Sequence, residues 1–231
     1  MCRAHRANAL RHPPHGHNPQ IPRLDIDPTA HGPGQFYSFL TSVIVPRPIA
    51  WVSTRSPEGV DNLAPHSFFT VASVDPPIVQ FTSVGRKDSL RNVERTREFV
   101  VCLTPEPLFE EVNATATDFP AEVSEFDAVG VEREASLRVA PPRVARSPVV
   151  LECTLHTTLT FGTGTVVLGR VVNAAIDEDA LVGGRPAIER LRPLARLGAN
   201  EWATIGEIRE ISRIGYREWP GHYKTPGIRR G

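Results

Sequence analysis

The residues best suited to chemistry in this sequence form a polar turn, residues 85–89, that leads into an amphipathic segment at 89–97. Arg86 and Lys87 bring positive charge to the turn, and Ser89 adds a hydroxyl where a helix is predicted to begin. The first turn of a helix presents unpaired N–H groups and the positive end of the helix dipole, so it binds anions readily. This pattern predicts a phosphate site.

The acid in this turn, Asp88, needs a different role because a carboxylate that faces a phosphate would repel it. Asp88 is a good N-cap, and we expect it to cap the helix whose apolar side chains Leu90 and Val93 turn inward. The alternative is an ordinary capped surface helix with solvated basic residues. The residues alone leave both interpretations open.

A second candidate site is the segment 62–69, NLAPHSFF, which combines small residues, a proline, a hydroxyl and paired aromatic residues. Pro65 has no backbone N–H, and the small residues Ala64 and Ser67 cover little of the backbone. We therefore expect this backbone to lie open beside a flat ligand. His66 is the titratable residue of the segment, and it is either a group that neutralises charge on the ligand or a structural imidazole.

A third polar segment, 113–120, carries an amide, hydroxyls and a carboxylate, with Asn113 and Thr115 as candidate ligand contacts. Loops of this composition are usually turns that bond to their own backbone, and that alternative stays open. The sequence contains no GxSxG, HExxH or GxGxxG pattern. We therefore assign no catalytic residue.

The elements that would position these segments are mostly strands, because apolar and polar residues alternate in short runs. One hairpin is predicted within 46–69, with its turn at Ser56-Pro57-Glu58-Gly59. A longer hairpin joins 149–160 to 165–176 and would close a barrel. Further strands are predicted at 42–45, 78–83, 98–103 and 204–211.

Length and composition limit the class of protein. At 231 residues the chain has room for one barrel-sized domain. Its 26 basic residues balance its 26 acidic ones, so no net field favours nucleic acid or an anionic membrane. Cys2, Cys102 and Cys153 are widely spaced and odd in number, which argues against a disulfide framework and a zinc or iron–sulfur site. We expect two buried strand thiols, one tail thiol and no metal site.

The two ends of the chain differ from its middle. Residues 1–23 are rich in Pro, His and Arg and are predicted to form a disordered tail, although its histidines could also bind a metal. No apolar run reaches the ~18 residues of a membrane-spanning helix, and no secretory h-region is visible, so we expect a cytoplasmic protein. The domain is predicted at 24–213, with a C-terminal extension at 214–231.

Four separated motifs occur in an order that resembles the flavin reductase-like family, the FMN-binding split-barrel proteins that include reductase components of two-component monooxygenases and the flavoredoxins. They are PRPIAWVST from Pro46, NLAPHSFF from Asn62, KDSLRN from Lys87 and NATATDFP from Asn113. The segment RLGANEW from Arg196 is similar to the family's RLGG-x-x-Y segment, with departures at Ala199 and Trp202. The resemblance covers residues 24–213, most of the chain.

The resemblance implies an all-β split β-barrel with a few peripheral helices that binds FMN, or alternatively FAD. It also implies hydride transfer from NADH or NADPH to the flavin, and a homodimer with flavin near the interface. Reduced flavin or electrons would pass to a partner such as a monooxygenase. The resemblance favours the phosphate interpretation of residues 87–89, and it places the loop 113–120 near the cofactor.

The residues that these motifs assign to the cofactor come from five segments. They are Arg47, Pro48, Ser53, Asn62, Ala64, Pro65, His66, Ser67, Phe68, Lys87, Asp88, Ser89, Asn113, Thr115 and Arg196. Two other functions are compatible with the same sequence. One is a flavoredoxin-like electron carrier that binds flavin without nicotinamide activity, and the other is a flavin-free split barrel used as an interaction module.

Overall fold

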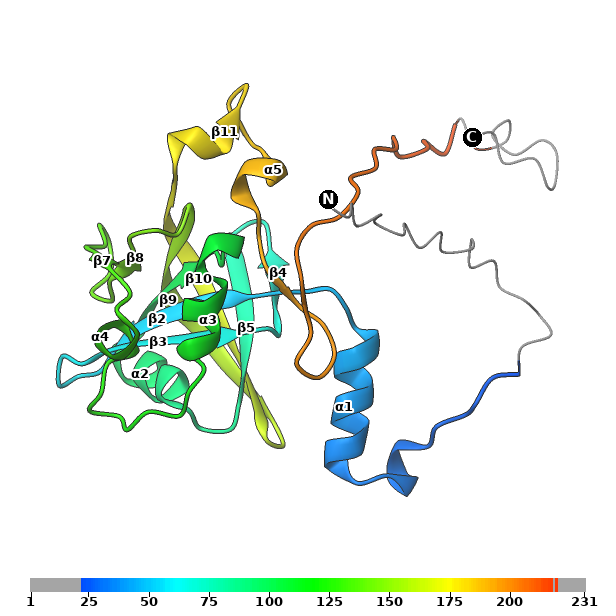
Figure 1. Cartoon of the computed structure of the whole chain (residues 1–231), viewed down its shortest axis with the longest axis horizontal. Coiled ribbons are helices and arrows are strands. Elements are labelled where there is room, and N and C mark those ends of the chain that lie inside the picture. The colour runs from blue at the N-terminus through cyan, green and yellow to red at the C-terminus, as the bar shows by residue number, and fades with distance from the viewer. Residues whose placement is uncertain (1–21, 218, 220–231) are drawn as a thin grey trace, which may run out of the picture.

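The fold is built on one curved antiparallel sheet of seven strands, shown in the computed structural model of Figure 1, which describes residues 22–217 and 219. In sheet order the strands are β3 (Asp61–His66), β2 (Ala50–Arg55), β6 (Glu98–Cys102), β9 (Val149–Phe161), β10 (Gly164–Ile176), β5 (Ile78–Val84) and β4 (Phe69–Ser73). The predicted all-β split barrel with peripheral helices is confirmed.

The longest hairpin lies where the alternation of residues predicted it. β9 and β10 pair from Phe161 and Gly164 at the turn to Val149 and Ile176 at the far end. A register shift beside Gly169 interrupts the pairing. A Cβ on Gly169 would lie 2.1 Å from the Phe99 ring, so glycine is required where the bulge meets the core.

Strand β2 separates two apolar clusters, because successive side chains of a strand point to opposite faces of the sheet. Ala50 and Val52 pack in a cluster that includes Phe81 and Phe99. Trp51, between them in sequence, packs on the opposite face in a second cluster. Buried side chains therefore hold β2 on both of its faces, and this also fixes its register with the neighbouring strand β3.

Short elements surround the sheet. The helices are α1 (Pro33–Val43), α2 (Asp88–Thr96), α3 (Phe109–Ala114), α4 (Glu125–Val129) and α5 (Ile188–Leu191), with 3-10 turns η1 (Pro28–Ala30), η2 (Glu106–Leu108) and η3 (Glu178–Ala180). The short strands are β1 (Arg47–Pro48), β7 (Arg133–Glu134), β8 (Arg143–Val144), β11 (Leu181–Val182), β12 (Arg185–Pro186), β13 (Ala195–Arg196) and β14 (Trp202–Ala203). Leu90 and Val93 of α2 turn into the core, as predicted.

The predicted strand at 42–45 is wrong, because α1 continues to Val43. The hydroxyl of Ser42 donates to the carbonyl of Ser38 at 2.8 Å within the helix. The guanidinium of Arg47 donates to the carbonyls of Thr41 and Ile44 at the end of the helix. The β-branched residues Val43, Ile44 and Val45 are typical of a strand, but Arg47 binds the carbonyls at the end of the helix, where a positive charge interacts favourably with the helix dipole.

The predicted strand at 204–211 is also wrong, since this described segment has no regular secondary structure and only β14 precedes it. A strand needs a neighbour for its backbone groups, and the free sheet edges, β3 and β4, are not paired by this segment. Strand β4 itself was not predicted. It follows the polar corner directly and pairs with β5.

The described part of the chain contains no helix long and apolar enough to cross a membrane. Cys102 and Cys153 are free and buried on strands, as predicted. Cys2 and the histidines of the predicted tail lie outside the described residues, as does most of the predicted C-terminal extension.

Candidate functional site

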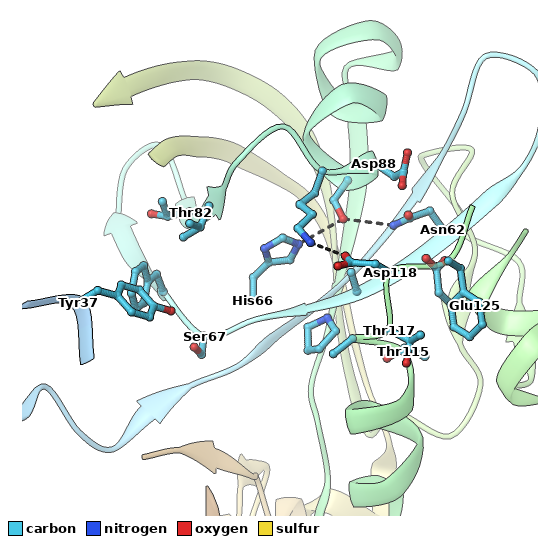
Figure 2. Close-up of a pocket in the computed structure, with 18 residues that line it drawn as sticks. Tyr37, Asn62, His66, Ser67, Thr82, Asp88, Thr115, Thr117, Asp118 and Glu125 are labelled. Carbon is cyan, nitrogen blue, oxygen red and sulfur yellow. Dashed lines mark hydrogen bonds and ion pairs between the residues drawn. The ribbon is translucent and has the colours of Figure 1, made fainter. Parts of the chain in front are cut away.

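A cavity of about 260 Å³ lies where one edge of the sheet meets α2 and the loop after α3 (Figure 2). Its wall is formed by β3 and the residues that follow it, by residues 87–89 and by the loop 115–119. Thr82 and Val84 of β5, Tyr37 of α1 and Glu125 of α4 complete it. Tyr37 and Glu125 lie on opposite sides of the view in Figure 2. The three polar segments singled out in the sequence therefore meet around one space.

The hydroxyl of Ser89 connects two of these segments. The amide Nδ2 of Asn62 donates to Ser89 Oγ at 3.2 Å, and Ser89 Oγ lies 3.2 Å from Nε2 of His66. Because Oγ accepts from Asn62, its own proton is available for Nε2. The other imidazole nitrogen then donates to the backbone of Thr82. The network fixes β3 against the start of α2 and already uses the Ser89 hydroxyl proton.

His66 is buried and neutral in this network. Its pKa is lowered from 6.5 to about 4, mainly because of burial; the hydrogen bond to Thr82 opposes this shift, and the charge of Lys87 adds to it. Its ring also packs against Phe81, with ring centroids 4.7 Å apart. At neutral pH the imidazole therefore carries no positive charge, which favours the structural role over charge neutralisation.

The start of α2 presents free backbone donors to the cavity. Lys87 occupies the N-cap position, and no side chain there caps the helix. The N–H groups of residues 88–90 have no partner from a preceding helical turn. This is the arrangement that binds phosphate in other proteins, and Lys87 adds a positive charge beside it.

Asp88 does not cap the helix, so that prediction is wrong. It is the first helical residue, and its carboxylate pairs with Arg91 one turn further along. An acid in the first turn still interacts favourably with the helix dipole. The pairing with Arg91 also removes the conflict expected between this acid and a phosphate.

The loop 115–119 is anchored at its first residue. The indole N–H of Trp51 donates to the hydroxyl of Thr115 at 2.9 Å, and that hydroxyl donates to the carbonyl of Val112 at 3.0 Å. Further along the loop, Asp118 forms an ion pair with Lys87. The loop is therefore anchored to the core at Thr115 and contacts the start of α2 through Asp118.

Glu125 places a second carboxylate in the wall. It accepts the backbone N–H of Leu63 at 2.8 Å, which satisfies a donor on the outer edge of β3. Burial raises the pKa of this carboxyl, and the nearby Asp88 raises it further, while the hydrogen bond from Leu63 acts in the opposite direction. Because its pKa is raised, the Glu125 carboxyl group is better suited to accept hydrogen bonds from hydroxyl groups than to remain as an unpaired negative charge.

The aromatic side of the cavity is formed by Tyr37 and Phe68, whose ring centroids lie 6.2 Å apart. Tyr37 comes from α1, which is held to the rest of the fold through Arg47. The Arg47 guanidinium donates to the carbonyl of Leu197 at 2.7 Å in addition to the end of α1. Flat aromatic faces of this kind favour a flat ligand.

Ten of the fifteen residues that the motifs assigned to the cofactor line this cavity. They are Asn62, Ala64, Pro65, His66, Ser67, Phe68, Lys87, Asp88, Ser89 and Thr115.

The other five do not line it, and each has a structural setting instead. Arg47 and Pro48 form β1, which pairs with Arg196 and its neighbour on β13. Arg196 lies over the ring of Trp202, 4.6 Å from its centroid. Ser53 is fully buried within the sheet, and Asn113 is exposed on α3.

Eight lining residues are not among those that the motifs assigned to the cofactor: Tyr37, Thr82, Val84, Ala116, Thr117, Asp118, Phe119 and Glu125. Asp118 lies within the motif that begins at Asn113, but polar composition does not distinguish a ligand contact from a turn that bonds to its own backbone. Tyr37 and Glu125 stand 25 or more residues from the motifs on β3 that they reach, and no local pattern reveals such contacts.

Comparison with known proteins places this geometry in a family. The flavin reductase-like domain model matches residues 42–189. A protein of Aquifex aeolicus is 37% identical over 172 residues, which cover 70% of this chain and 86% of that protein. Component B of nitrilotriacetate monooxygenase from Bacillus cereus superposes with a TM-score of 0.80 at 31% identity, over 83% of this chain and 100% of that one.

A protein with a split barrel domain from Shewanella frigidimarina shares the fold, with a TM-score of 0.74 at 17% identity over 80% of this chain and 96% of that one. The family model covers more than half of the sequence, including three of the segments that surround the cavity. The chain belongs to the flavin reductase-like domain family.

Proposed function

We propose that this chain is an FMN-binding flavin reductase that transfers hydride from NADH or NADPH to flavin and supplies reduced flavin or electrons to a partner such as a monooxygenase. The observation that carries the proposal is the cavity itself. An uncapped helix start with Lys87 and an aromatic wall with Tyr37 and Phe68 border the same space in a chain of this family.

The residues present fit a flavin mononucleotide. Lys87 and the free N–H groups at the start of α2 would hold its phosphate. Glu125 and Asn62 would face its hydroxyl-bearing chain, and the segment from Ala64 to Phe68 would lie along its ring. The Ser89 hydroxyl proton is used by His66, so Ser89 would bind phosphate through its backbone N–H.

The flavin would supply the two-electron chemistry when bound. The chain's own task is to bind and orient it, because no nucleophile or acid–base pair is needed. Neutral His66 holds Ser89 in place through the hydrogen bond between them. Pro65 has no backbone N–H, so the backbone at this position would present no donor to the flavin ring. The outer edge of β3 also has no neighbouring strand, so its remaining backbone groups can face a ligand.

We also propose a homodimer, on the basis of exposed apolar residues near the cavity. Figure 1 shows α1 projecting from the barrel, and its side chains Phe39, Leu40 and Val43 are 39–54% exposed. Ile44 and Val45 directly after it are 60% and 40% exposed. An isolated helix of this length is marginal in water, so covering this face with a second copy would stabilise it.

The test of the function is anaerobic addition of NADH, and separately of NADPH, to protein mixed with FMN, with free FMN as the control. Loss of the oxidised-flavin absorbance much faster than in the control is expected with one of the two nucleotides. If FMN binds and neither nucleotide reduces it, a flavoredoxin-like carrier replaces the reductase. If FMN does not bind, the proposal is wrong and an interaction module remains.

A further inference from the structure

The charges that line the cavity pose a problem for an anionic ligand. Among its described lining residues, Lys87 is the one lysine or arginine, whereas Asp88, Asp118 and Glu125 are acidic. His66 adds no positive charge at neutral pH. A phosphate monoester carries about −1.5 to −2 charges at neutral pH, so the wall must offer it Lys87.

Two of the three acids are already compensated without Lys87. Asp88 pairs with Arg91, which stands outside the cavity lining. Glu125 accepts the N–H of Leu63. Asp118, in contrast, pairs with Lys87 itself, the cation that a phosphate requires.

We propose that Asp118 competes with the flavin phosphate for Lys87 and thereby weakens the binding of flavin nucleotides that carry a phosphate. This inference rests on the proposed function. When the phosphate binds, Lys87 transfers from the Asp118 carboxylate to the phosphate, and Asp118 turns toward solvent.

The geometry permits this exchange. The side chains of Lys87 and Asp118 are 54% and 81% exposed, so neither is held in place by packing. The Trp51 hydrogen bond fixes the loop at Thr115, three residues before Asp118, and the tip can move without loss of that anchor. An exposed ion pair contributes little to stability, so a phosphate that also receives helix N–H groups can displace it.

The test compares dissociation constants for FMN and for riboflavin, which lacks the phosphate, by quenching of flavin fluorescence at fixed ionic strength. Asp118→Asn is expected to tighten FMN binding by about two- to fivefold, the upper part of the range that one exposed ion pair allows, and to leave riboflavin binding unchanged. Asp127→Asn is the matched control. Asp127 is 71% exposed and paired with Arg133 but does not line the cavity, and its removal is expected to change neither constant.

The same substitution made in a Lys87→Ala variant separates competition for Lys87 from simple repulsion between Asp118 and the phosphate. In Lys87→Ala protein the Asp118→Asn substitution is expected to improve FMN binding by less than about twofold, because no cation remains to compete for. An equal gain with and without Lys87 would overturn the inference, as would unchanged FMN binding in Asp118→Asn alone. In either of these outcomes FMN still binds, so the proposed function stands. If FMN binds to none of the variants nor to the natural chain, the inference and the proposed function are both contradicted.

Discussion

The hydrogen-bond network of the cavity depends on the direction in which the Ser89 hydroxyl proton points. This hydroxyl accepts from Asn62 and faces Nε2 of His66, so the protonation of His66 decides which way the hydroxyl proton points. With neutral His66 the proton is donated to the ring. Protonated His66 would donate to Ser89 instead and would place a second positive charge beside Lys87.

The buried imidazole makes folding stability depend on pH. The pKa of His66 is about 4 in the folded chain and 6.5 when unperturbed, so the unfolded chain takes up this proton first as the pH falls. The stability that neutral His66 contributes is complete above pH 6.5 and is lost as the pH falls toward 4. From pH ~7 to pH ~4.5 this loss amounts to about 2 to 3 kcal/mol.

Urea unfolding at these two pH values checks the prediction. Between these two pH values, the free energy of unfolding of His66→Asn is expected to fall by about 2 kcal/mol less than that of the natural chain. His156→Asn removes an exposed imidazole and serves as the matched control, with the natural pH dependence expected. If both variants follow the natural curve, His66 is not the buried titrating group described here.

At the scale of elements, α1 links the cavity to the exposed apolar surface. One of its side chains, Tyr37, lines the cavity, while Val43 near its end is 54% exposed. Arg47 binds the carbonyls at the helix end and that of Leu197, so the helix direction is set by residues far along the chain. A partner copy that covers α1 would therefore act close to the site.

Substitution on this helix tests the homodimer. The natural chain is expected to have about twice its 25.4 kDa mass in light scattering, and Val43→Lys is expected to return it to the monomer mass. A lysine at this end of a helix interacts favourably with the dipole, so folding should be retained. Leu137→Lys is the control, since Leu137 is 74% exposed on a different loop and should leave the dimer intact. A natural chain that is monomeric, or a dimeric Val43→Lys variant, contradicts the prediction.

The elements that sequence could predict are those whose signals are local. The hairpin of β9 and β10 follows from alternating residues, and the inward face of α2 follows from the spacing of Leu90 and Val93. The end of α1 could not be predicted, because side-chain bonds from Ser42 and Arg47 override the strand preference of a β-branched run.

At the scale of the whole molecule, the cavity depends on contacts between distant segments. Asn62 meets Ser89, Lys87 meets Asp118 and Leu63 meets Glu125, and in each case the partners belong to different elements. Motifs identified three of the segments that surround the cavity, but no local pattern could predict the pairing of Lys87 with Asp118. That pairing decides how strongly an anion can be held.

The measurement that tests the central claim most directly is a crystal structure of the chain with FMN bound. We expect the phosphate within hydrogen-bond distance of Lys87 Nζ and of the backbone N–H groups at the start of α2, with the ring along the segment from Ala64 to Phe68. Asp118 should no longer contact Lys87. FMN bound elsewhere, for example with its phosphate on Arg47 or Arg196, would contradict the account.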